Sequence, residues 1–409
     1  MRLTKNRQKL AAWCLGGILF YSVLLSTLFE VRAIWKKMKW RTNSLYTLQQ
    51  LALSQGVSFD QRTPTQAYSD LLKDFPTAVT HLPPSLFYPA KGELKIRGNV
   101  FQPLGGVSRE VTLGWGEMGE WRRYTTDEYG FRNPIGLYSM APIDILVLGD
   151  SFAIAESVSD EENIAGRFRR SNPKTINLGV SDIGPLTELA ILREYGTATR
   201  PKNVIWLYYD GNDISGITEE MESPILRKYI DPNDFKQSLV AIQPELDTAL
   251  RNLIKERFEI SKKVSTLSNF LQASADFPDK LFDILYFRAF RRAAGLSETP
   301  LNRVRFEGRP DQLKVFSIIA KAIQRECSKF NGELTFVYLP EWLTLKYPVR
   351  KDRDPVLAII RDLNIPIVDG VQILSQGGDP LSYFPLRFQG HYTPEGYRVI
   401  QEAISEHIK

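Results

Sequence analysis

The chain of 409 residues contains few cysteines and histidines, and this scarcity excludes several kinds of site. Its two cysteines are Cys14, in an apolar run, and Cys327, in a predicted helix, so we expect no disulfide framework. The sequence has no Cys-x-x-Cys pair and no cluster of cysteines and histidines, which argues against a structural zinc site. Chemistry that requires a histidine is restricted to His81, His391 and His407.

The signature of a nucleic-acid-binding protein is also missing. The formal net charge is +5, and much of the positive charge lies near the N-terminus. Elsewhere there is no run of basic residues interleaved with aromatic ones. Hydrophobic residues make up 43% and charged residues 24%, as in ordinary globular proteins. We therefore expect a folded protein whose basic N-terminal region faces a membrane, with no nucleic acid as partner.

One long hydrophobic run is present, over residues 10–29, and it contains no charged residue. Twenty helical residues reach across a hydrocarbon core of about 30 Å. A cleaved signal peptide is the alternative, but its apolar core is usually about 7–15 residues long. The sequence therefore predicts a single uncleaved transmembrane helix. Basic residues on its two sides nearly balance, so the positive-inside rule does not fix its orientation.

The rest of the chain divides into two regions by pattern. Residues 42–130 combine helix and loop with short strand-like segments broken by glycine. From 131 to 409, buried strand-like runs alternate with helical stretches at about 161–171, 185–198, 310–329, 352–363 and 394–408. Such alternation predicts an α/β domain, a three-layer sandwich with a central parallel sheet covered by helices on both faces.

A long charged segment interrupts this alternation at about 214–309, and its pattern is mostly helical. In open α/β sheets the loops that follow the carboxyl ends of strands border the ligand crevice. We therefore interpret this helical insertion as a cap over a site. A surface excursion without such a role is the alternative.

The sharpest local motif is Gly149-Asp150-Ser151, at the end of an apolar run that reads as a buried strand. This placement puts a serine hydroxyl at the carboxyl edge of the sheet, where free backbone N–H groups can stabilise an oxyanion. The alternative is a simple turn in which Asp150 or Ser151 caps the next helix.

Two further motifs are expected at the same edge. Asn212 follows the third buried strand and can donate a hydrogen bond to a developing oxyanion, although Gly-Asn-Asp is also good turn chemistry. His391 lies in a loop framed by Gly390 and Pro394, just before a predicted helix.

The order serine, asparagine, histidine at successive strand ends resembles the Ser-Gly-Asn-His hydrolases, also called the GDSL family. The resemblance covers roughly residues 125–409 without the insertion. Gly130-Phe131-Arg132 and the segment 177–184 are similar to further family blocks, as found in membrane-attached bacterial members. The segment 390–397 resembles the ending of polysaccharide acetyltransferase relatives. The resemblance implies a flavodoxin-like sheet.

It also implies a mechanism and a location. Ser151 would be the nucleophile and His391 its base, with the oxyanion held by the N–H groups of Ser151 and Asp182 and by the amide of Asn212. The substrate would be an acyl ester of a carbohydrate or lipid, cleaved or transferred without a metal or organic cofactor. Residues 1–41 would form a cytoplasmic tail, the anchor and a basic flank, with the catalytic domain outside the cytoplasm, on the periplasmic side.

The sequence departs from the family pattern at two positions. Asp182 stands where the family usually has glycine, so its side chain is expected to crowd the oxyanion hole. Gln389 stands where an acid normally precedes the histidine, and a neutral amide supplies no charge. Either Asp369 or Asp379 replaces this acid, or the chain uses a Ser–His dyad. A membrane-tethered binding or assembly factor for an envelope polysaccharide, without turnover, is the alternative function.

Overall fold

The computed structural model describes residues 47–88, 93–231, 234–271, 310–347 and 353–408. The predicted membrane segment, residues 10–29, lies outside this part of the chain. Within the described ranges, no helix combines the length and apolar character needed to cross a membrane. The chain divides into two compact units, Met1–Ser58 and Phe59–Lys409. The first is described only from residue 47 and contains a helix over 47–54.

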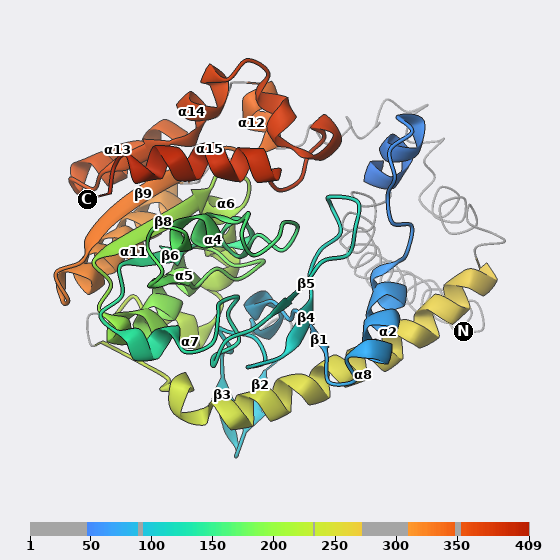
Figure 1. The fold of residues 1–409 in the computed structure, drawn as a ribbon. Helices are drawn as coiled ribbons and strands as arrows, with labels where there is room; N and C mark the ends of the chain where they lie inside the picture. The colour runs from blue at the N-terminus through green and yellow to red at the C-terminus, as the bar shows by residue number, and fades with distance from the viewer. Residues whose placement is uncertain (1–46, 89–92, 232–233, 272–309, 348–352, 409) are drawn as a thin grey trace, which may run out of the picture. The chain divides into compact units, whose positions relative to one another are not determined.

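The second unit is built on a five-stranded parallel sheet (Figure 1). Its strands follow the order β10-β9-β8-β6-β7, which is the order 2-1-3-4-5 of doubly wound folds read from the other side. The predicted α/β fold with a parallel sheet is therefore confirmed. The strands are β6 (Ile145–Leu148), β7 (Thr175–Asn177), β8 (Asn203–Tyr209), β9 (Glu333–Leu339) and β10 (Ile367–Asp369).

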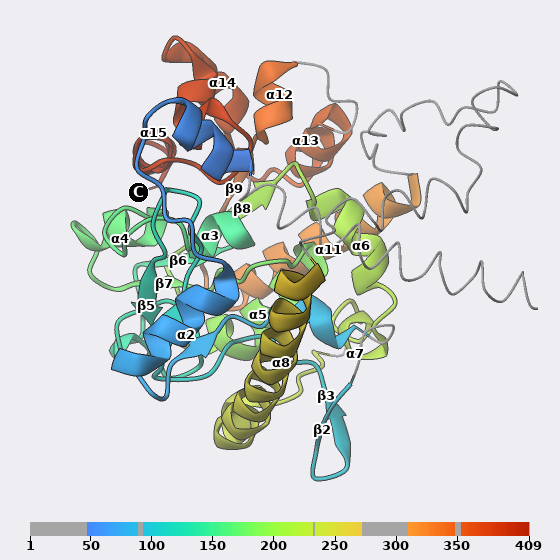
Figure 2. The same ribbon diagram turned by 90° about the vertical axis from the view of Figure 1, so that its right-hand side faces the viewer.

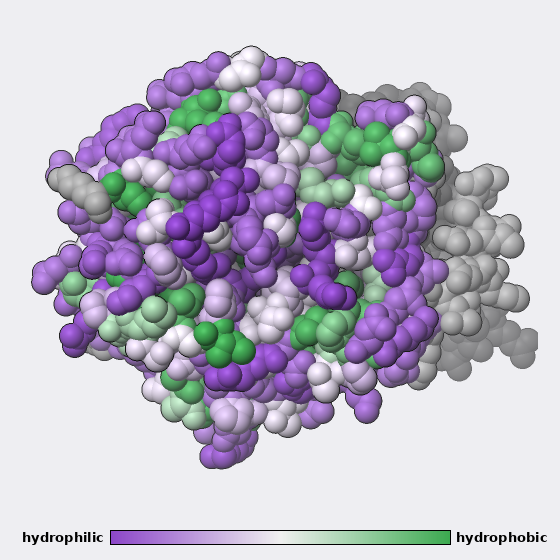
Figure 3. Space-filling model, in the orientation of Figure 1, coloured by the Kyte–Doolittle hydropathy of each residue, from purple (hydrophilic) through white to green (hydrophobic). Residues whose placement is uncertain are grey.

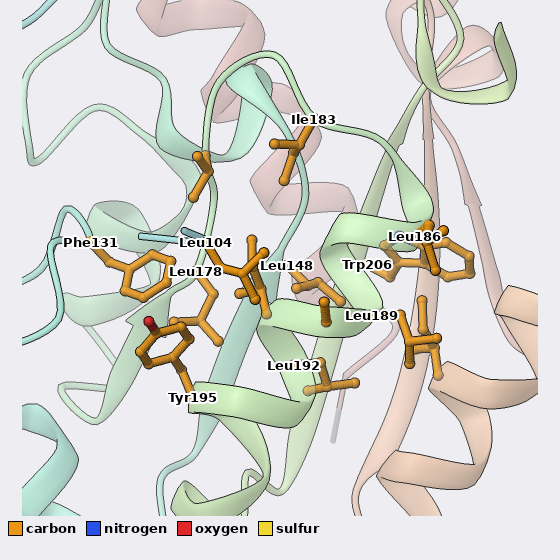
Figure 4. Packing of buried hydrophobic residues seen from close by; sticks show 14 of the residues in the cluster. Leu104, Phe131, Leu148, Leu178, Ile183, Leu186, Leu189, Leu192, Tyr195 and Trp206 are labelled. Atoms are coloured by element: carbon orange, nitrogen blue, oxygen red, sulfur yellow. The ribbon is translucent and has the colours of Figure 1, made fainter. Parts of the chain in front are cut away.

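Both faces of the sheet are buried at its centre, because alternate residues of β6, β8 and β9 enter different cores. Leu146 and Leu148 of β6 lie in one cluster, while Ile145 and Val147 lie in the other. The first cluster takes in residues of α5, α11 and α13, and the second takes in residues of α4, α14 and α15. Figure 4 shows part of the first cluster, with Trp206 beside the leucines of the segment after β7. Apolar runs without a period of two are the expected result of this double burial.

The helices of the sandwich lie close to their predicted places (Figures 1 and 2). The main ones are α4 (Ile164–Arg169), α5 (Pro185–Ile191), α11 (Pro310–Ser328), α13 (Arg353–Asp362) and α15 (Pro394–Ser405). Shorter helices follow individual strands: α3 (Ser151–Ile154), α6 (Asp213–Glu220), α7 (Pro224–Arg227), α12 (Trp342–Lys346) and α14 (Gly370–Gln376). One turn of π-helix, η3 (Leu192–Gly196), extends α5, and the 3₁₀ turn η4 (Thr197–Thr199) completes the predicted helix 185–198.

The segment before the sandwich forms small sheets; four of their strands lie where strands were predicted, and β1 lies in a stretch that was expected to be helix and loop. β1 (Val79–Thr80), β4 (Val111–Leu113) and β5 (Arg123–Thr125) form a sheet in the order β1-β4-β5, and β2 (Leu94–Ile96) pairs with β3 (Asn99–Phe101). Helix α2 (Pro64–Asp74) begins at a capping box made by Thr63 and Gln66. Leu104, Val107 and Phe131 join the first core cluster, so this segment packs on the sandwich.

The described part of the insertion contacts this preceding segment. Helix α8 (Gln243–Leu271) packs against α2, β1 and β2, as Figures 1 and 2 show. The Asp247 carboxylate accepts hydrogen bonds from the backbone N–H (2.9 Å) and hydroxyl (2.5 Å) of Ser108. Arg251 forms an ion pair of 2.7 Å with Glu110. Helix α8 thus packs along the small sheets. Residues 272–309 lie outside the described ranges, so the cap over a site stays a prediction.

Hydrophilic residues predominate on the face of the molecule shown in Figure 3, and hydrophobic ones form separate small groups. Remaining short helical turns are η1 (Pro84–Phe87), η2 (Leu137–Met140), η5 (Leu239–Ile242), η7 (Pro380–Tyr383) and η8 (Pro385–Arg387). Of these, η7 and η8 matter most for the site, because they lead into the loop that carries His391.

Candidate active site

The loop after β6 presents Ser151 at the carboxyl edge of the sheet. Gly149 is needed here because a Cβ on it would lie 2.9 Å from the carbonyl oxygen of Leu207 on the neighbouring strand β8. Asp150 is the N-cap of α3, and its carboxylate accepts the N–H of Phe152 at 2.9 Å. Asp150 therefore does the capping, and this leaves the half-buried Ser151 hydroxyl for other chemistry.

Asn212 meets Ser151 at the carboxylate of Asp150. Its amide nitrogen and the Ser151 hydroxyl both lie 3.4 Å from Oδ2 of Asp150. The amide oxygen of Asn212 is buried and has no hydrogen-bond partner in the described part of the chain. Ser151 and Asn212, two predicted site residues, therefore lie close together, with Asp150 between them.

Asp210 fixes the loop that carries Asn212. Its carboxylate accepts hydrogen bonds from the backbone N–H of Glu341 (2.6 Å), the hydroxyl of Thr344 (2.8 Å) and the hydroxyl of Tyr338 (3.1 Å). These donors follow or end β9, so the loops after two adjacent strands are held to each other.

His391 lies at the same edge. Its ring is 4.7 Å from the ring of Phe152, the residue after Ser151, measured between centroids. The next residue, Tyr392, packs edge-on against Phe152 at 4.8 Å. Among the described contacts, the hydroxyl of Ser151 has its hydrogen bond with Asp150 and not with His391. Catalytic hydrogen bonds are often long in free enzymes and shorten when substrate binds.

The partner of His391 is a residue that the sequence did not point to, Glu117. Nδ1 of the ring lies 2.7 Å from Oε2 of Glu117, and the backbone N–H of His391 donates to the same oxygen at 3.0 Å. A neutral ring that donates from Nδ1 presents Nε2 as a base. The pair therefore has the arrangement of the acid and base in a serine triad.

Glu117 and His391 each stabilise the charged form of the other. Burial alone would raise the pKa of Glu117, but the charge of His391 and its hydrogen bonds outweigh burial and lower it. Burial alone would lower the pKa of His391, but the charge and hydrogen bond of Glu117 raise it, with smaller contributions from Asp150 and Glu156. The carboxylate is thus able to stabilise an imidazolium ion.

Glu117 reaches the ring from a turn between β4 and β5, 274 residues before His391. Met118, beside it, packs against the second core cluster, which anchors the turn. Gly390 permits the approach, since a Cβ on it would lie 3.2 Å from Oε2 of Glu117. The only local signal for Glu117 is its place in the glycine-rich segment Gly114-Trp115-Gly116-Glu117-Met118-Gly119, and this does not say which edge the turn contacts.

The three residues predicted to orient His391 are placed elsewhere. Asp369 caps α14, accepting the N–H of Val371 at 3.1 Å, and forms an ion pair with Arg353. Asp379 caps η7 and pairs with Arg387. Gln389 is half-buried, and no hydrogen bond joins it to the ring in the described structure. None of the three forms a hydrogen bond with the ring in the described structure; the carboxylate that does so is Glu117.

Asp182 adopts a left-handed backbone conformation, with φ of +62°. Glycine takes up this conformation without steric cost, which explains why glycine is expected at this position. The carboxylate of Asp182 accepts a hydrogen bond from the hydroxyl of Ser85 on η1 at 2.6 Å. The side chain is thus held by the small-sheet segment, which limits the crowding expected from the sequence.

A group of buried carboxyl groups lies behind Asp150. Glu188 accepts the indole N–H of Trp206 at 2.6 Å, and Asp213 accepts the backbone N–H of Tyr209 at 2.8 Å. Burial and then mutual repulsion raise the pKa of Asp213 well above its ordinary value. Burial also raises the pKa of Glu188 well above its ordinary value, despite the Trp206 hydrogen bond, which lowers it.

Glu220 belongs to the same group and is held by three backbone N–H donors, from Gly184, Leu186 and Thr187. Burial raises its pKa, against these hydrogen bonds. Within the described residues, no group of three or more His, Cys, Asp or Glu side chains is arranged to hold a metal ion.

Comparison with known proteins gives distant likenesses only. No family model matches the chain, and no curated protein matches it. A solved structure from Desulfitobacterium hafniense DCB-2, provisionally named a lipolytic protein of the G-D-S-L family, is 13% identical with a TM-score of 0.34. The match covers 64% of this chain and 98% of that one. A second solved structure is 10% identical with a TM-score of 0.31, covering 64% and 94%. The chain is thus similar in structure to a protein given a G-D-S-L name, and neither likeness assigns it to a family.

Proposed function

We propose that the protein is a serine-dependent ester hydrolase or O-acyltransferase. The observation that carries the proposal is the contact between His391 and Glu117, on the sheet edge that also presents Ser151. A buried carboxylate on Nδ1 of a histidine, beside an accessible serine, is the arrangement that activates a hydroxyl for acyl transfer.

In this mechanism Ser151 Oγ attacks the ester carbonyl carbon while Nε2 of His391 takes the hydroxyl proton. Glu117 stabilises the imidazolium ion that results. The proposed oxyanion donors are the N–H groups of Ser151 and Asp182 and the amide of Asn212. The alcohol leaves with the proton from His391, and an acyl-serine remains. Water or a sugar hydroxyl, deprotonated by His391, then releases the acyl group.

The substrate class and location remain part of the proposal. An acyl ester of a carbohydrate or lipid suits the chemistry, and the apolar run of residues 10–29 suits a membrane anchor. A reporter fused after Lys409 tests the orientation: extracytoplasmic activity is expected, and cytoplasmic activity would contradict it.

The alternative, a binding or assembly factor without turnover, rested on Gln389. That residue stands where the family has an acid before the histidine, so the sequence motif lacks a charge at this position. Glu117 supplies a carboxylate at 2.7 Å from the ring, which removes this ground for the alternative.

Covalent labelling by a fluorophosphonate tests the proposal directly. Intact-mass analysis of the wild-type protein should show one adduct, because an activated serine is phosphonylated selectively. Ser151→Ala should abolish the adduct, and Ser171→Ala, which removes a serine hydroxyl elsewhere in the same domain, should keep it. Equal labelling of Ser151→Ala and the wild type would remove Ser151 from the mechanism.

A further inference from the structure

Three carboxylates on different segments act on His391 through their charge, and one of them also contacts its ring. Glu117 contacts the ring itself, Asp150 precedes the nucleophile, and Glu156 lies on the loop after α3. The charges of all three act on the histidine. The candidate nucleophile and base therefore sit in a negative electrostatic environment.

Glu156 is held in place and has no role in the proposed proton transfers. Its two carboxylate oxygens accept hydrogen bonds of 3.0 Å from the hydroxyls of Tyr124 and Ser181. Ser181 adjoins Asp182, one of the proposed oxyanion donors. Glu156 thus lies between the small-sheet segment and the loop that would contact the substrate.

The guanidinium group of Arg132, which donates to backbone carbonyls beside Glu156, is engaged with protein partners. It is buried and donates to the backbone carbonyls of Ile154, Ala155 and Val158 and to Asp160. These hydrogen bonds hold the loop that carries Glu156, so the buried guanidinium group is not available to a ligand. Arg387, near Gln389 in sequence, is paired with Asp379.

We infer, on the basis of the proposed function, that the site selects esters whose alcohol part is neutral or cationic and disfavours anionic alcohols. The leaving alcohol takes its proton from His391, so it must lie between a ring that contacts Glu117 and a serine that contacts Asp150, within reach of the charge of Glu156. A negative charge brought there is repelled, and a positive charge is attracted. Phosphorylated alcohols and alcohols that carry a carboxylate or sulfonate are therefore poor leaving partners, and neutral or amino-bearing ones are good.

Three acetate esters that share one acyl group test the inference. Acetylcholine carries a cation, 3,3-dimethylbutyl acetate is its neutral isostere, and 2-acetoxyethanesulfonate carries an anion. Acetate release by the wild-type protein at low salt should give kcat/KM for the anionic ester about tenfold or more below the neutral one, with the cationic ester at or above it. The differences should shrink at high salt, because added ions screen the repulsion.

A pair of variants locates the effect. Glu156→Gln should narrow the ratio of kcat/KM between the neutral and the anionic ester severalfold. Glu161→Gln removes an exposed carboxylate five residues further on and should leave the gap unchanged. Equal or faster cleavage of the anionic ester, with the neutral ester cleaved, would overturn the charge inference alone. Failure to cleave any of the three, together with absence of Ser151 labelling, would overturn the proposed function and the inference with it.

Discussion

Glu117 and Asp213 are both buried acids near the sheet edge, but their pKa values shift in opposite directions. Burial raises the pKa of both groups. For Glu117 the charge and hydrogen bonds of His391 reverse this effect, whereas Asp213 faces the further carboxyl groups Glu188 and Asp150, which reinforce it. The difference teaches that the partner, and not the depth of burial, decides which carboxyl group is available as a catalytic anion.

Because Glu117 is the acid that is held as an anion, removal of its charge should have the largest effect on kcat. Glu117→Gln keeps the shape and can still accept the Nδ1–H bond, but it cannot stabilise imidazolium. We expect kcat on a neutral ester to fall by roughly 10³–10⁴-fold, as in serine triads that lose their acid. Glu120→Gln changes an exposed acid in the same turn and serves as control. A loss smaller than about threefold in a folded Glu117→Gln protein would contradict the role given to Glu117.

The pH profile sharpens the same comparison. His391 must be neutral to accept the serine proton, so kcat/KM is lost as pH falls through the histidine pKa. Because Glu117 raises this pKa, the acid limb of the wild-type profile should lie above the ordinary histidine value of about 6.5. In Glu117→Gln the residual activity should show this limb at lower pH. The same limb in both proteins would mean that Glu117 does not act on His391.

Neutralising the other acid should affect stability and not catalysis. The pKa of Asp213 is raised in the folded protein. The buried acid therefore costs no stability at a pH below its ordinary pKa, and the free energy of unfolding falls as pH rises above that value. Asp213→Asn can still accept the N–H of Tyr209. We expect it to leave thermal unfolding almost unchanged near pH 4 and to raise the free energy of unfolding by about 1–3 kcal/mol at pH 8. Thermal unfolding followed at both pH values measures this, with Asp362→Asn, at an exposed position, as control; destabilisation at pH 8 would count against a raised pKa of Asp213.

The smallest effect is expected at Gln389. Had the histidine lacked an acid, Gln389→Asp would raise kcat. With Glu117 already on Nδ1, the substitution should change kcat on a neutral ester less than about twofold. Asp369→Asn and Asp379→Asn should likewise keep kcat, and both helices should keep their caps, because asparagine caps a helix about as well as aspartate does. A large gain for Gln389→Asp would show that Glu117 does not provide the charge in solution.

The sequence was sufficient for features set by local pattern. Five apolar runs gave five buried strands, because a parallel strand covered on both faces needs no polar alternation. Ser151, Asn212 and His391 were found because each follows a strand or precedes a helix within a few residues. Glu117 was missed because its contact with His391 depends on how a separate turn docks, and no local rule encodes that. The packing of α8 against α2, β1 and β2 was not predicted either, because it also depends on how distant segments dock.

The span between Glu117 and His391 also affects when the protein becomes active during synthesis. A chain made from its N-terminus exposes the turn with Glu117 and then Ser151, the proposed nucleophile, well before the ribosome adds His391. The proposed base arrives with the C-terminal helix α15, so a partly synthesised chain holds Ser151 without it. Contacts of such long sequence separation form late in folding. The proposed site is therefore assembled only after the C-terminal helix has joined the domain, so a partly synthesised chain should show no activity of the proposed kind.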